Sequence, residues 1–463
     1  MAKMKTPVIY IEEKQIAEYG METIAQIMKS IYGYLWGMPM LVVLLGTHLY
    51  FTFRLGVIQR KIPKGIRLSF SKTEESNEGI SPFSALATAL AATIGTGNII
   101  GISAAIAIGG PGAVFWCWVT GVFGIATCYA ECFLAVKYRV QKPDGSFLGG
   151  PMYVMEKALH QKSAAVIFAL STILASLGMG SSVQSHSICA AVTANYRISP
   201  QIIGAVAAVL AGIVILGGAR QISRVCTYLV PFMSVFYMGG CLLLLWINRD
   251  FLGETLAVIV RSAFSSKSVA GGIAGTAVMT GMRTGISKGL FTNEAGLGSI
   301  PMTAASARTS SPVKQGIISM TGPFWDTVVM CAITGIAIVS SMLRTPAAYQ
   351  GVADDQLCFL AFAGLPVDGS FMLSVSLVLF AFATIIGWSY YGECAVQYLW
   401  GKQKILAYRV LYIMAVYLGA VMSLDVVWTV SDLFNSFMAI PNILCIWMLR
   451  KVIIGETRMS LNR

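Results

Sequence analysis

The sequence predicts an all-α polytopic membrane protein that crosses the bilayer about eleven times. Of its 463 residues, 56% are hydrophobic and only 12% are charged, whereas average soluble proteins are roughly 45–50% apolar and about 25% charged. So few charges cannot cover so much apolar surface in water, which excludes a soluble single-core enzyme. The apolar runs are long and continuous rather than alternating, which indicates spanning helices and excludes a β-barrel.

The predicted elements begin with a polar segment at residues 1–30, which we expect to lie at the membrane interface rather than to form a cleavable signal peptide. A spanning helix needs about 20 apolar residues. The first such stretch, at about 31–53, is an extra N-terminal helix, and a tail at 450–463 ends the chain. Ten core helices, numbered 1 to 10, lie between them at about 82–108, 112–136, 163–192, 202–216, 226–247, 271–305, 316–342, 370–399, 405–422 and 426–449.

The basic residues predict how the chain is oriented. With the N-terminus outside, the segments predicted to lie inside hold 22 Lys and Arg residues, and those predicted to lie outside hold 9. This excess matches the preference of cytoplasmic loops for positive charge. The net charge of +12 therefore indicates membrane topology rather than nucleic-acid binding, and we expect the C-terminal tail to be cytoplasmic.

Two core helices contain stretches that favour a break. Core helix 1 carries Gly-Thr-Gly-Asn at 95–98, and core helix 6 carries a run rich in Gly and Asn at 288–298. Glycine inside a helix costs roughly 1 kcal/mol relative to alanine. Interrupted spans at corresponding places in two halves point to the binding site of a transporter.

The two halves also resemble each other directly after these stretches. Core helix 2 opens with Gly-Pro-Gly-Ala-Val-Phe-Trp at 110–116, and core helix 7 opens with Gly-Pro-Phe-Trp at 322–325. We therefore expect a five-plus-five inverted repeat, with residues 82–247 and 271–449 as its units. An unwound segment at the midplane offers free N–H groups to a carboxylate and free carbonyls to Na⁺ or an ammonium group. A zwitterionic amino acid together with a cation uses both.

Five motifs resemble those of the sodium:alanine symporter family, whose members carry alanine or glycine with a cation. They lie at Gly95–Ile99, Gly109–Trp118, Gly149–Tyr153, Thr292–Ser299 and Trp388–Glu393. The resemblance covers about 32–449 and implies a LeuT-like fold with one extra N-terminal helix. It also implies Na⁺-driven uptake of alanine or glycine across a prokaryotic plasma membrane.

The chain departs from the pattern of that family at three places. Cys117 stands where Met is usual, Lys288 stands where Arg is common, and residues 300–305 lack the His often found there. These departures bear on substrate preference and on the inner gate rather than on the class of reaction.

The candidate substrate-binding residues of core helices 1 and 3 are polar or glycine. We expect Thr96, Gly97 and Asn98 to contact the substrate carboxylate or the ion, largely through backbone groups. The alternative is a helix kink with a packed asparagine. Gln184 is a polar group in an apolar run, which fits a hydrogen bond either to the substrate or to another helix.

The resemblance places the side-chain pocket at Phe291, Thr384 and Trp388. Thr384 and Trp388 are four residues apart, so they share one face of core helix 8. We expect Trp388 to cover a small substrate and exclude larger ones, and the alternative is an aromatic side chain that only packs.

Sodium prefers hard oxygen ligands, so the candidate ion ligands are Thr93, Gly95, Thr384 and Ser389. Glu294, beside the second break, is a further functional candidate because an intramembrane carboxylate is costly. In the alternative interpretation, acidic residues in or near the spans brace helices or pair with Arg283 and Lys288, and these residues are Glu131, Asp326, Glu393, Asp425 and Asp432.

These observations predict a secondary active transporter, not an enzyme, with Na⁺ as the coupling ion and no cofactor. Its expected partners are a small neutral amino acid, Na⁺ and the lipid bilayer, with no nucleic acid, and the chain is expected to be a monomer. The ten cysteines form no CxxC pair, so no metal site other than one for Na⁺ is expected. Three alternatives stay open: proton coupling through Lys288 or Glu294, an ion channel, and a membrane-embedded enzyme.

Overall fold

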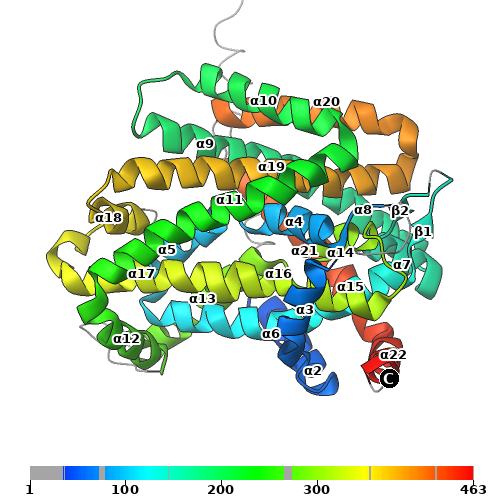
Figure 1. The fold of residues 1–463 in the computed structure, drawn as a ribbon, viewed down its shortest axis with the longest axis horizontal. Coiled ribbons are helices and arrows are strands. Elements are labelled where there is room, and N and C mark those ends of the chain that lie inside the picture. Colours follow the sequence, from blue (N-terminus) through cyan, green and yellow to red (C-terminus); the bar gives the residue numbers. More distant parts are fainter. Residues whose placement is uncertain are drawn as a thin grey trace, which may run out of the picture.

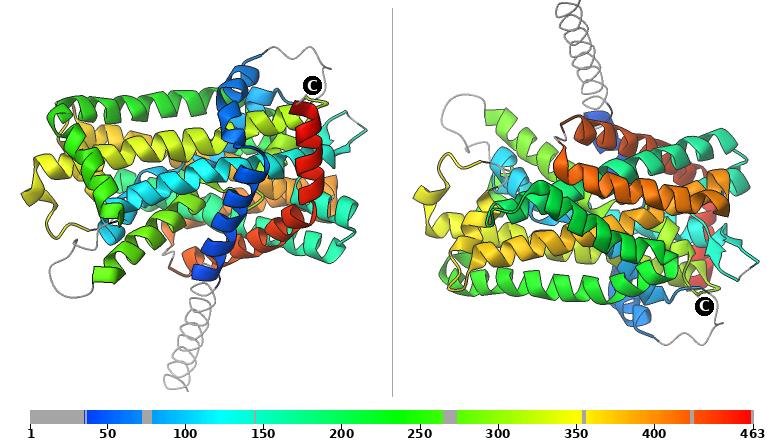
Figure 2. Two further views of the ribbon diagram at one scale, coloured as in Figure 1. Left: turned by 90° about the horizontal axis from the view of Figure 1, so that it is seen from below. Right: turned by 90° about the horizontal axis from the view of Figure 1, so that it is seen from above.

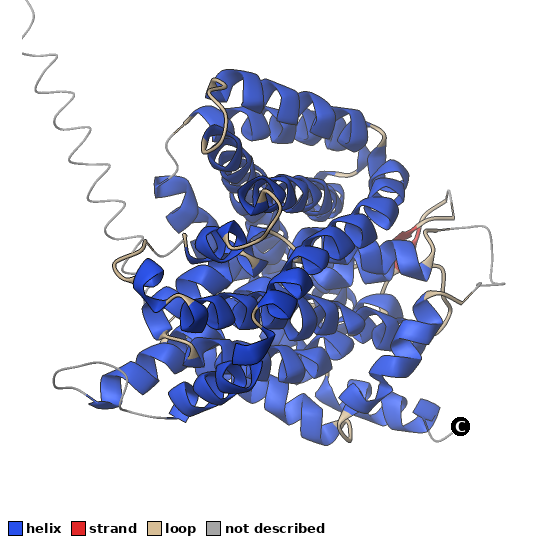
Figure 3. Ribbon diagram, turned by 60° about the vertical axis from the view of Figure 1, so that its left-hand side comes forward, coloured by secondary structure: helices blue, strands red, loops and turns tan. Residues whose placement is uncertain are grey.

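The computed structural model describes residues 35, 37–71, 79–143, 145–264, 274–353, 356–422 and 425–461. The polar segment expected at 1–30 lies outside these residues. Helices make up nearly all of the described chain (Figure 3), beside one short antiparallel pair of strands, β1 (Val140–Gln141) and β2 (Phe147–Leu148). The fold is therefore mostly helical, as expected.

The elements of the first half follow the predicted order. Core helix 1 is divided in two, and core helix 3 contains a π-helical segment. The helices are α2 (Met38–Arg54), η1 (Ile58–Lys61), α3 (Ile62–Ser69), α4 (Pro82–Thr93), η2 (Thr96–Asn98), α5 (Ile100–Gly109), α6 (Gly112–Lys137), α7 (Pro151–Leu159), α8 (Lys162–Ala175), η3 (Ser176–Ser182), α9 (Val183–Thr193), α10 (Pro200–Leu216) and α11 (Gly218–Ile247).

In the second half, core helix 6 is divided and core helix 7 contains a π-helical segment, η5. The helices are η4 (Arg249–Phe251), α12 (Leu252–Phe264), α13 (Ala274–Asn293), α14 (Ile300–Ala305), α15 (Pro312–Ser319), α16 (Thr321–Pro323), η5 (Phe324–Cys331), α17 (Ala332–Arg344), η6 (Pro346–Tyr349), α18 (Leu357–Ala363), α19 (Gly369–Trp400), η7 (Lys402–Lys404), α20 (Ile405–Val421), α21 (Asp425–Met448) and α22 (Arg450–Leu461).

The number of spans depends on how broken helices are counted. Within the described residues, seven helices are long and apolar enough to cross a membrane, or up to nine if each of two bent pairs is one span. Core helix 4, α10, has 17 residues and is shorter than the rest. The chain is a multi-pass membrane protein, and the count of eleven stays a prediction.

The core helices run side by side along the long axis of the molecule, with α10 packed on α20 and α19 passing through the middle (Figure 1). Along α19, large side chains such as Phe380 and Tyr391 are fully buried, whereas α10 exposes Ile202, Val209 and Ile213. Such exposure fits a helix that faces lipid hydrocarbon.

The extra N-terminal helix differs in direction from the core. In Figure 2 (left), α2 and α3 cross the bundle at a steep angle to the core helices, and α22 crosses it in a similar direction. The α2 helix packs on α6, and the chain bends by 66° between Met38–Arg54 and Ile58–Ser69. The sequence pattern carried no information on this crosswise direction.

Two ion pairs that join helices differ in how exposed their side chains are. Arg409 of α20 binds Glu393 of α19 through Nη2 to Oε1 (2.8 Å) and Nε to Oε2 (2.9 Å), and the two side chains are 16% and 10% exposed. Lys137 of α6 binds Glu456 of α22 at 2.7 Å, and these side chains are 28% and 38% exposed. Glu393 therefore braces two helices, which is one of the roles left open for the acidic residues.

We expect Glu393→Gln to destabilise the protein more than Glu456→Gln. The first variant weakens charge-assisted hydrogen bonds shielded from water, worth about 1.5–3 kcal/mol. The second weakens a more exposed pair worth about 0–1 kcal/mol. Apparent melting temperatures of the two purified variants in one detergent measure the difference, and equal shifts would contradict it.

Candidate functional site

Both stretches predicted to interrupt helices do so. The first break separates α4 from η2 and α5, and the chain bends there by 62°. The second break spans residues 294–299, between the end of α13 at Asn293 and the start of α14 at Ile300. Glu294 begins it with a φ of 52°, a left-handed conformation that is uncommon for a residue other than glycine.

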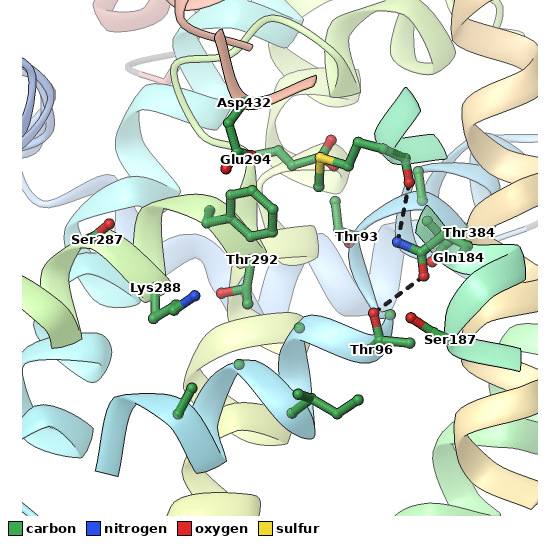
Figure 4. Close-up of a pocket in the computed structure, with 18 residues that line it drawn as sticks. Thr93, Thr96, Gln184, Ser187, Ser287, Lys288, Thr292, Glu294, Thr384 and Asp432 are labelled. Atoms are coloured by element: carbon green, nitrogen blue, oxygen red, sulfur yellow. Dashed lines mark hydrogen bonds between the residues drawn. The ribbon is translucent and has the colours of Figure 1, made fainter. Parts of the chain in front are cut away.

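A cavity of about 220 Å³ lies between the two breaks (Figure 4). It brings together five of the predicted substrate-binding residues, namely Thr96, Gly97, Gln184, Phe291 and Thr384. Of the predicted ion ligands, Thr384 is among these five, and Thr93 and Gly95 also line the cavity, as does Glu294. Residues from both halves of the chain thus meet at one site.

Asn98 is also predicted to contact the substrate, but it does not line this cavity. Its side chain is fully buried, and its Oδ1 accepts a hydrogen bond from the Gly95 N–H at 2.9 Å. Its Nδ2 donates to Asp326 Oδ1 at 2.7 Å and to the Asp326 carbonyl at 3.1 Å. The structure therefore gives the Asn98 side chain a bracing role within the first break.

Trp388 and Ser389 of α19 are likewise buried away from the cavity. The Trp388 ring lies edge-on to Tyr391, with centroids 5.5 Å apart. The Ser389 hydroxyl donates to the Ile386 carbonyl at 2.6 Å. Helical spacing places Thr384 and Trp388 on one face of α19. It does not show that neighbouring helices cover Trp388 and leave Thr384 at the cavity.

Gln184 fulfils the interhelical role that the sequence left open and also lines the cavity. Its Oε1 accepts a hydrogen bond from the Thr96 hydroxyl, and its Nε2 donates to the Met179 carbonyl, both at 3.2 Å. The second bond reaches back into η3, whose π-helical turn is wider than an α-helical one. Figure 4 shows this chain of bonds from the first break to core helix 3.

Sequence reasoning missed several residues that line the cavity. Met179 and Ser187 flank the junction of η3 and α9, and Thr292 lies one residue before the end of α13. Thr292 begins the family-like motif Thr292–Ser299, and this position was the available signal that it lines the site. Paired glycines at 178 and 180 were the available signal for the π-helical segment that carries Met179.

Charged side chains also face this space. Lys288, Glu294 and Asp432 line the cavity from three elements. Lys288 Nζ is 6.0 Å from the centroid of the Phe291 ring, and the Glu294 carboxylate accepts a hydrogen bond from the Ser299 hydroxyl. The site therefore contains groups of both signs, which suits a zwitterionic ligand.

Some polar groups at the cavity have no protein partner. Within the described part of the chain, the Thr93 hydroxyl makes no hydrogen bond. The backbone N–H groups of Thr96 and Gly97 also have no acceptor among the described residues. Free N–H groups ahead of the α5 helix form an anion-binding arrangement, and a buried hydroxyl is a hard ligand for a cation.

Each break is held by a carboxylate from the opposite half of the chain. Asp326, in η5 of the second half, braces the first break through Asn98. Glu131, in α6 of the first half, accepts a hydrogen bond from the N–H of Gly296 in the second break at 2.6 Å. Asn442 of α21 completes this contact by donating to Glu131 Oε2 at 3.0 Å and to the Gly296 carbonyl at 2.9 Å.

Position 296 requires glycine for two reasons. Its φ of 95° is disfavoured for residues with a side chain, and a Cβ atom there would lie 2.5 Å from Leu44 of α2. The extra N-terminal helix thus covers the second break.

All ten cysteines are buried and unpaired, and the described residues contain no cluster of His, Cys, Asp and Glu that could hold a metal ion.

Comparisons with known sequences identify relatives along almost the whole chain. The sodium:alanine symporter family matches residues 21–461. The sodium/alanine symporter AgcS of Methanococcus maripaludis is 42% identical, over 93% of this chain and 96% of that protein. The probable sodium/glutamine symporter GlnT of Bacillus subtilis is 36% identical, over 92% of this chain and 90% of that protein.

Solved structures of transporters share the fold at low sequence identity. MhsT in complex with L-phenylalanine aligns with a TM-score of 0.56 and 14% identity, over 83% of this chain and 100% of that chain. A substrate-bound, outward-open Na⁺-coupled sialic acid symporter aligns with a TM-score of 0.51 and 14% identity, over 91% and 84% of the two chains. These similarities confirm a LeuT-like transporter fold.

We expect Gly95→Ala to disturb the site, because an added Cβ would lie 2.7 Å from the Thr384 hydroxyl oxygen. Such overpacking costs about 1–3 kcal/mol. The double variant Gly95→Ala/Thr384→Ala removes that oxygen and is expected to recover most of the lost thermal stability. Gly101→Ala is the matched control, because Gly101 lines the same cavity and its added Cβ would meet nothing within 4 Å. A Gly95→Ala protein as stable as the control would contradict this packing.

Proposed function

Because the chain belongs to the sodium:alanine symporter family, we propose that it carries a small neutral amino acid, alanine or glycine, into the cell together with Na⁺ by alternating access. Family and fold indicate a transporter and not an enzyme. The observation that carries the proposal is the cavity between the two breaks, where unpaired backbone N–H groups, a free hydroxyl and charges of both signs converge.

In this proposal the substrate carboxylate binds the N–H groups of Thr96 and Gly97. The positive end of the α5 helix dipole supports the negative charge. The ammonium group then faces the carbonyl ends of α4 and α13, with the Glu294 carboxylate beside them. Phe291 and Thr384, which line the cavity, contact the substrate side chain.

The proposed Na⁺ ligands are the Thr93 and Thr384 hydroxyls and the carbonyl of Gly95. Two observations support this set. The three residues line one cavity, and Thr93 Oγ1 has no hydrogen-bond partner among the described residues. Ser389 is left out because its hydroxyl is buried and bonded to Ile386. A Na⁺ ion placed here lies next to the carboxylate site, so each ligand favours binding of the other.

The positive-inside orientation places the cavity's remaining lining on the outer side. In this orientation α5, which follows the first break, and α13, which precedes the second, are the outer halves of the two broken helices. The cavity is lined on this side by Ile100 and Ala104 of α5 and by Ser287 of α13. We infer that the cavity opens outward in this state. This inference rests on the 22-to-9 distribution of basic residues between the two sides.

An inner gate closes the opposite side in the proposed cycle. Arg139, after α6, donates to the carbonyls of Ala305 at 3.0 Å, Ala307 at 2.7 Å and Thr309. Arg308 donates to the carbonyl of Gly79 at 2.7 Å, ahead of α4. Burial lowers the pKa of the Arg139 guanidinium to about 10, so it stays charged at neutral pH. Opening to the cytoplasm requires these bonds to break.

Proton coupling is the second candidate function. Glu294 favours it, because a fully buried carboxylate lines the cavity. A relative with 34% identity, from Bacillus subtilis, is named a putative sodium/proton-dependent alanine carrier protein. The ion dependence of uptake separates the two candidates.

We expect purified protein in liposomes to accumulate labelled alanine when Na⁺ is high outside and the pH is equal on both sides. The Na⁺ gradient supplies the work, and a membrane potential adds about 2.3 kcal/mol per charge per 100 mV. Replacing Na⁺ with K⁺ should abolish accumulation. Accumulation driven by a pH gradient in the absence of Na⁺ would instead establish proton coupling.

Removing the Thr93 hydroxyl should weaken Na⁺ binding, whereas removing the Ser389 hydroxyl should not. Thr93→Val keeps the branched shape and deletes a cavity-lining oxygen, while Ser389→Ala deletes one that is bonded to Ile386. Losing one neutral ligand is expected to raise the Na⁺ concentration for half-maximal uptake about three- to tenfold. The proposed ion site fails if Ser389→Ala shifts this concentration and Thr93→Val does not.

A further inference from the structure

An apolar groove of about 330 Å³ lies between α4 and α11, away from the substrate cavity. It reaches the surface at Phe70 and Val235, which are 68% and 67% exposed. One face of α4 forms the first wall, with residues at helical spacing: Phe83, Leu86, Ala87, Leu90 and Ile94. One face of α11 forms the second wall, including Val230, Ser234 and Met238.

The depth of this groove matches one leaflet of a bilayer. From Phe83 to Ile94 the α4 wall rises about 16 Å at 1.5 Å per residue, and half of a hydrocarbon core about 30 Å thick is about 15 Å. A hydrogen bond of 3.0 Å from the Thr227 hydroxyl to the Ser84 hydroxyl joins α11 to α4 near the shallow end. The lining carries no charged residue, and its shape suits one extended hydrocarbon chain.

A cluster of positive charge lies at the shallow end. Ser69 ends α3 and Phe70 directly follows it, and both line the groove. The continuous segment of η1 and α3 that precedes them exposes four cations: Arg60 and Lys61 in η1, and Lys64 and Arg67 in α3. None of the four forms an ion pair with another described residue. Four exposed cations cannot face hydrocarbon, so α3 lies at the boundary between membrane and water, where phosphate groups of lipids are found.

We propose that an acidic glycerophospholipid binds here, with its phosphate on the cations of η1 and α3 and one acyl chain in the groove between α4 and α11. Hydrophobic burial of the chain and attraction of the headgroup then act at opposite ends of one ligand. A neutral lipid can fill the groove but brings no net negative charge to the cations, and a free phosphate binds the cations but leaves the groove empty.

The site touches the helix that ends at the first break and the element that braces this break. Ile94, at the deep end, is the first residue after α4, and Met330, also in the lining, belongs to η5. η5 carries Asp326, which braces the break through Asn98. Under the proposed function, the bound lipid therefore packs against the part of core helix 1 that must move relative to α11, and uptake is faster with acidic lipid than without it.

Quenching of Trp325 by brominated lipid tests the site, because Trp325 lines the groove. The full chain is placed in phosphatidylcholine vesicles that contain increasing amounts of phosphatidylglycerol with brominated acyl chains. The same titration on Trp325→Phe isolates the Trp325 signal from the other eight of the nine tryptophans. We expect half-maximal quenching of Trp325 at a much lower mole fraction of brominated phosphatidylglycerol than of brominated phosphatidylcholine.

Two lysine pairs provide a matched comparison. Lys61→Gln/Lys64→Gln removes two charges from η1 and α3 and should raise the half-quenching fraction of phosphatidylglycerol about 30-fold. Lys402→Gln/Lys404→Gln removes the same charge at exposed positions that do not line the groove and should leave it unchanged. Ser234→Phe, which fills the groove, should weaken quenching by both lipids.

The proposal is overturned if both lipids quench Trp325 equally, or if the two lysine pairs shift quenching by the same amount. The measurement reads lipid contact and needs no transport. A protein that binds the lipid but transports no amino acid would therefore refute the proposed function and leave the lipid site standing.

Discussion

Inside a bilayer every backbone N–H and C=O group needs a hydrogen-bond partner, and the arrangement of this protein depends on how that need is met at two places where helices stop. At the first break the Asn98 side chain, held by Asp326, supplies a partner for the Gly95 N–H, and at the second Glu131 and Asn442 supply partners for Gly296. The N–H groups of Thr96 and Gly97 are left without acceptors among the described residues. In the proposed function, a substrate carboxylate completes them.

The braces also connect the two halves of the chain. Because Asp326 belongs to the second half and Glu131 to the first, each break is fixed to elements outside its own half. The Gln184–Thr96 bond adds core helix 3 to the first break, and Leu44 of the extra helix covers the second. Rearranging one break therefore displaces helices of the other half, which is the physical link that alternating access requires.

The sequence allowed the class of protein, the order of helices and both breaks to be predicted, because hydrophobic length and glycine content are local properties. Several residues that it singled out at the breaks line the cavity, as Thr96, Gly97 and Glu294 do. Asn98, Trp388 and Ser389 lie off the cavity because helical spacing identifies a shared face but not which neighbour covers it. The crosswise direction of α2 and the contact of Asn442 with Glu131 depend on pairings distant in sequence.

Equilibrium binding of alanine to the purified protein at different Na⁺ concentrations tests most directly whether one cavity binds an amino acid and Na⁺ together. We expect Na⁺ to lower the Kd of alanine, and alanine to lower the Kd of Na⁺ by the same factor. Coupling between sites is typically about 5- to 150-fold. An alanine Kd that is identical in NaCl and in choline chloride of equal concentration would contradict joint binding.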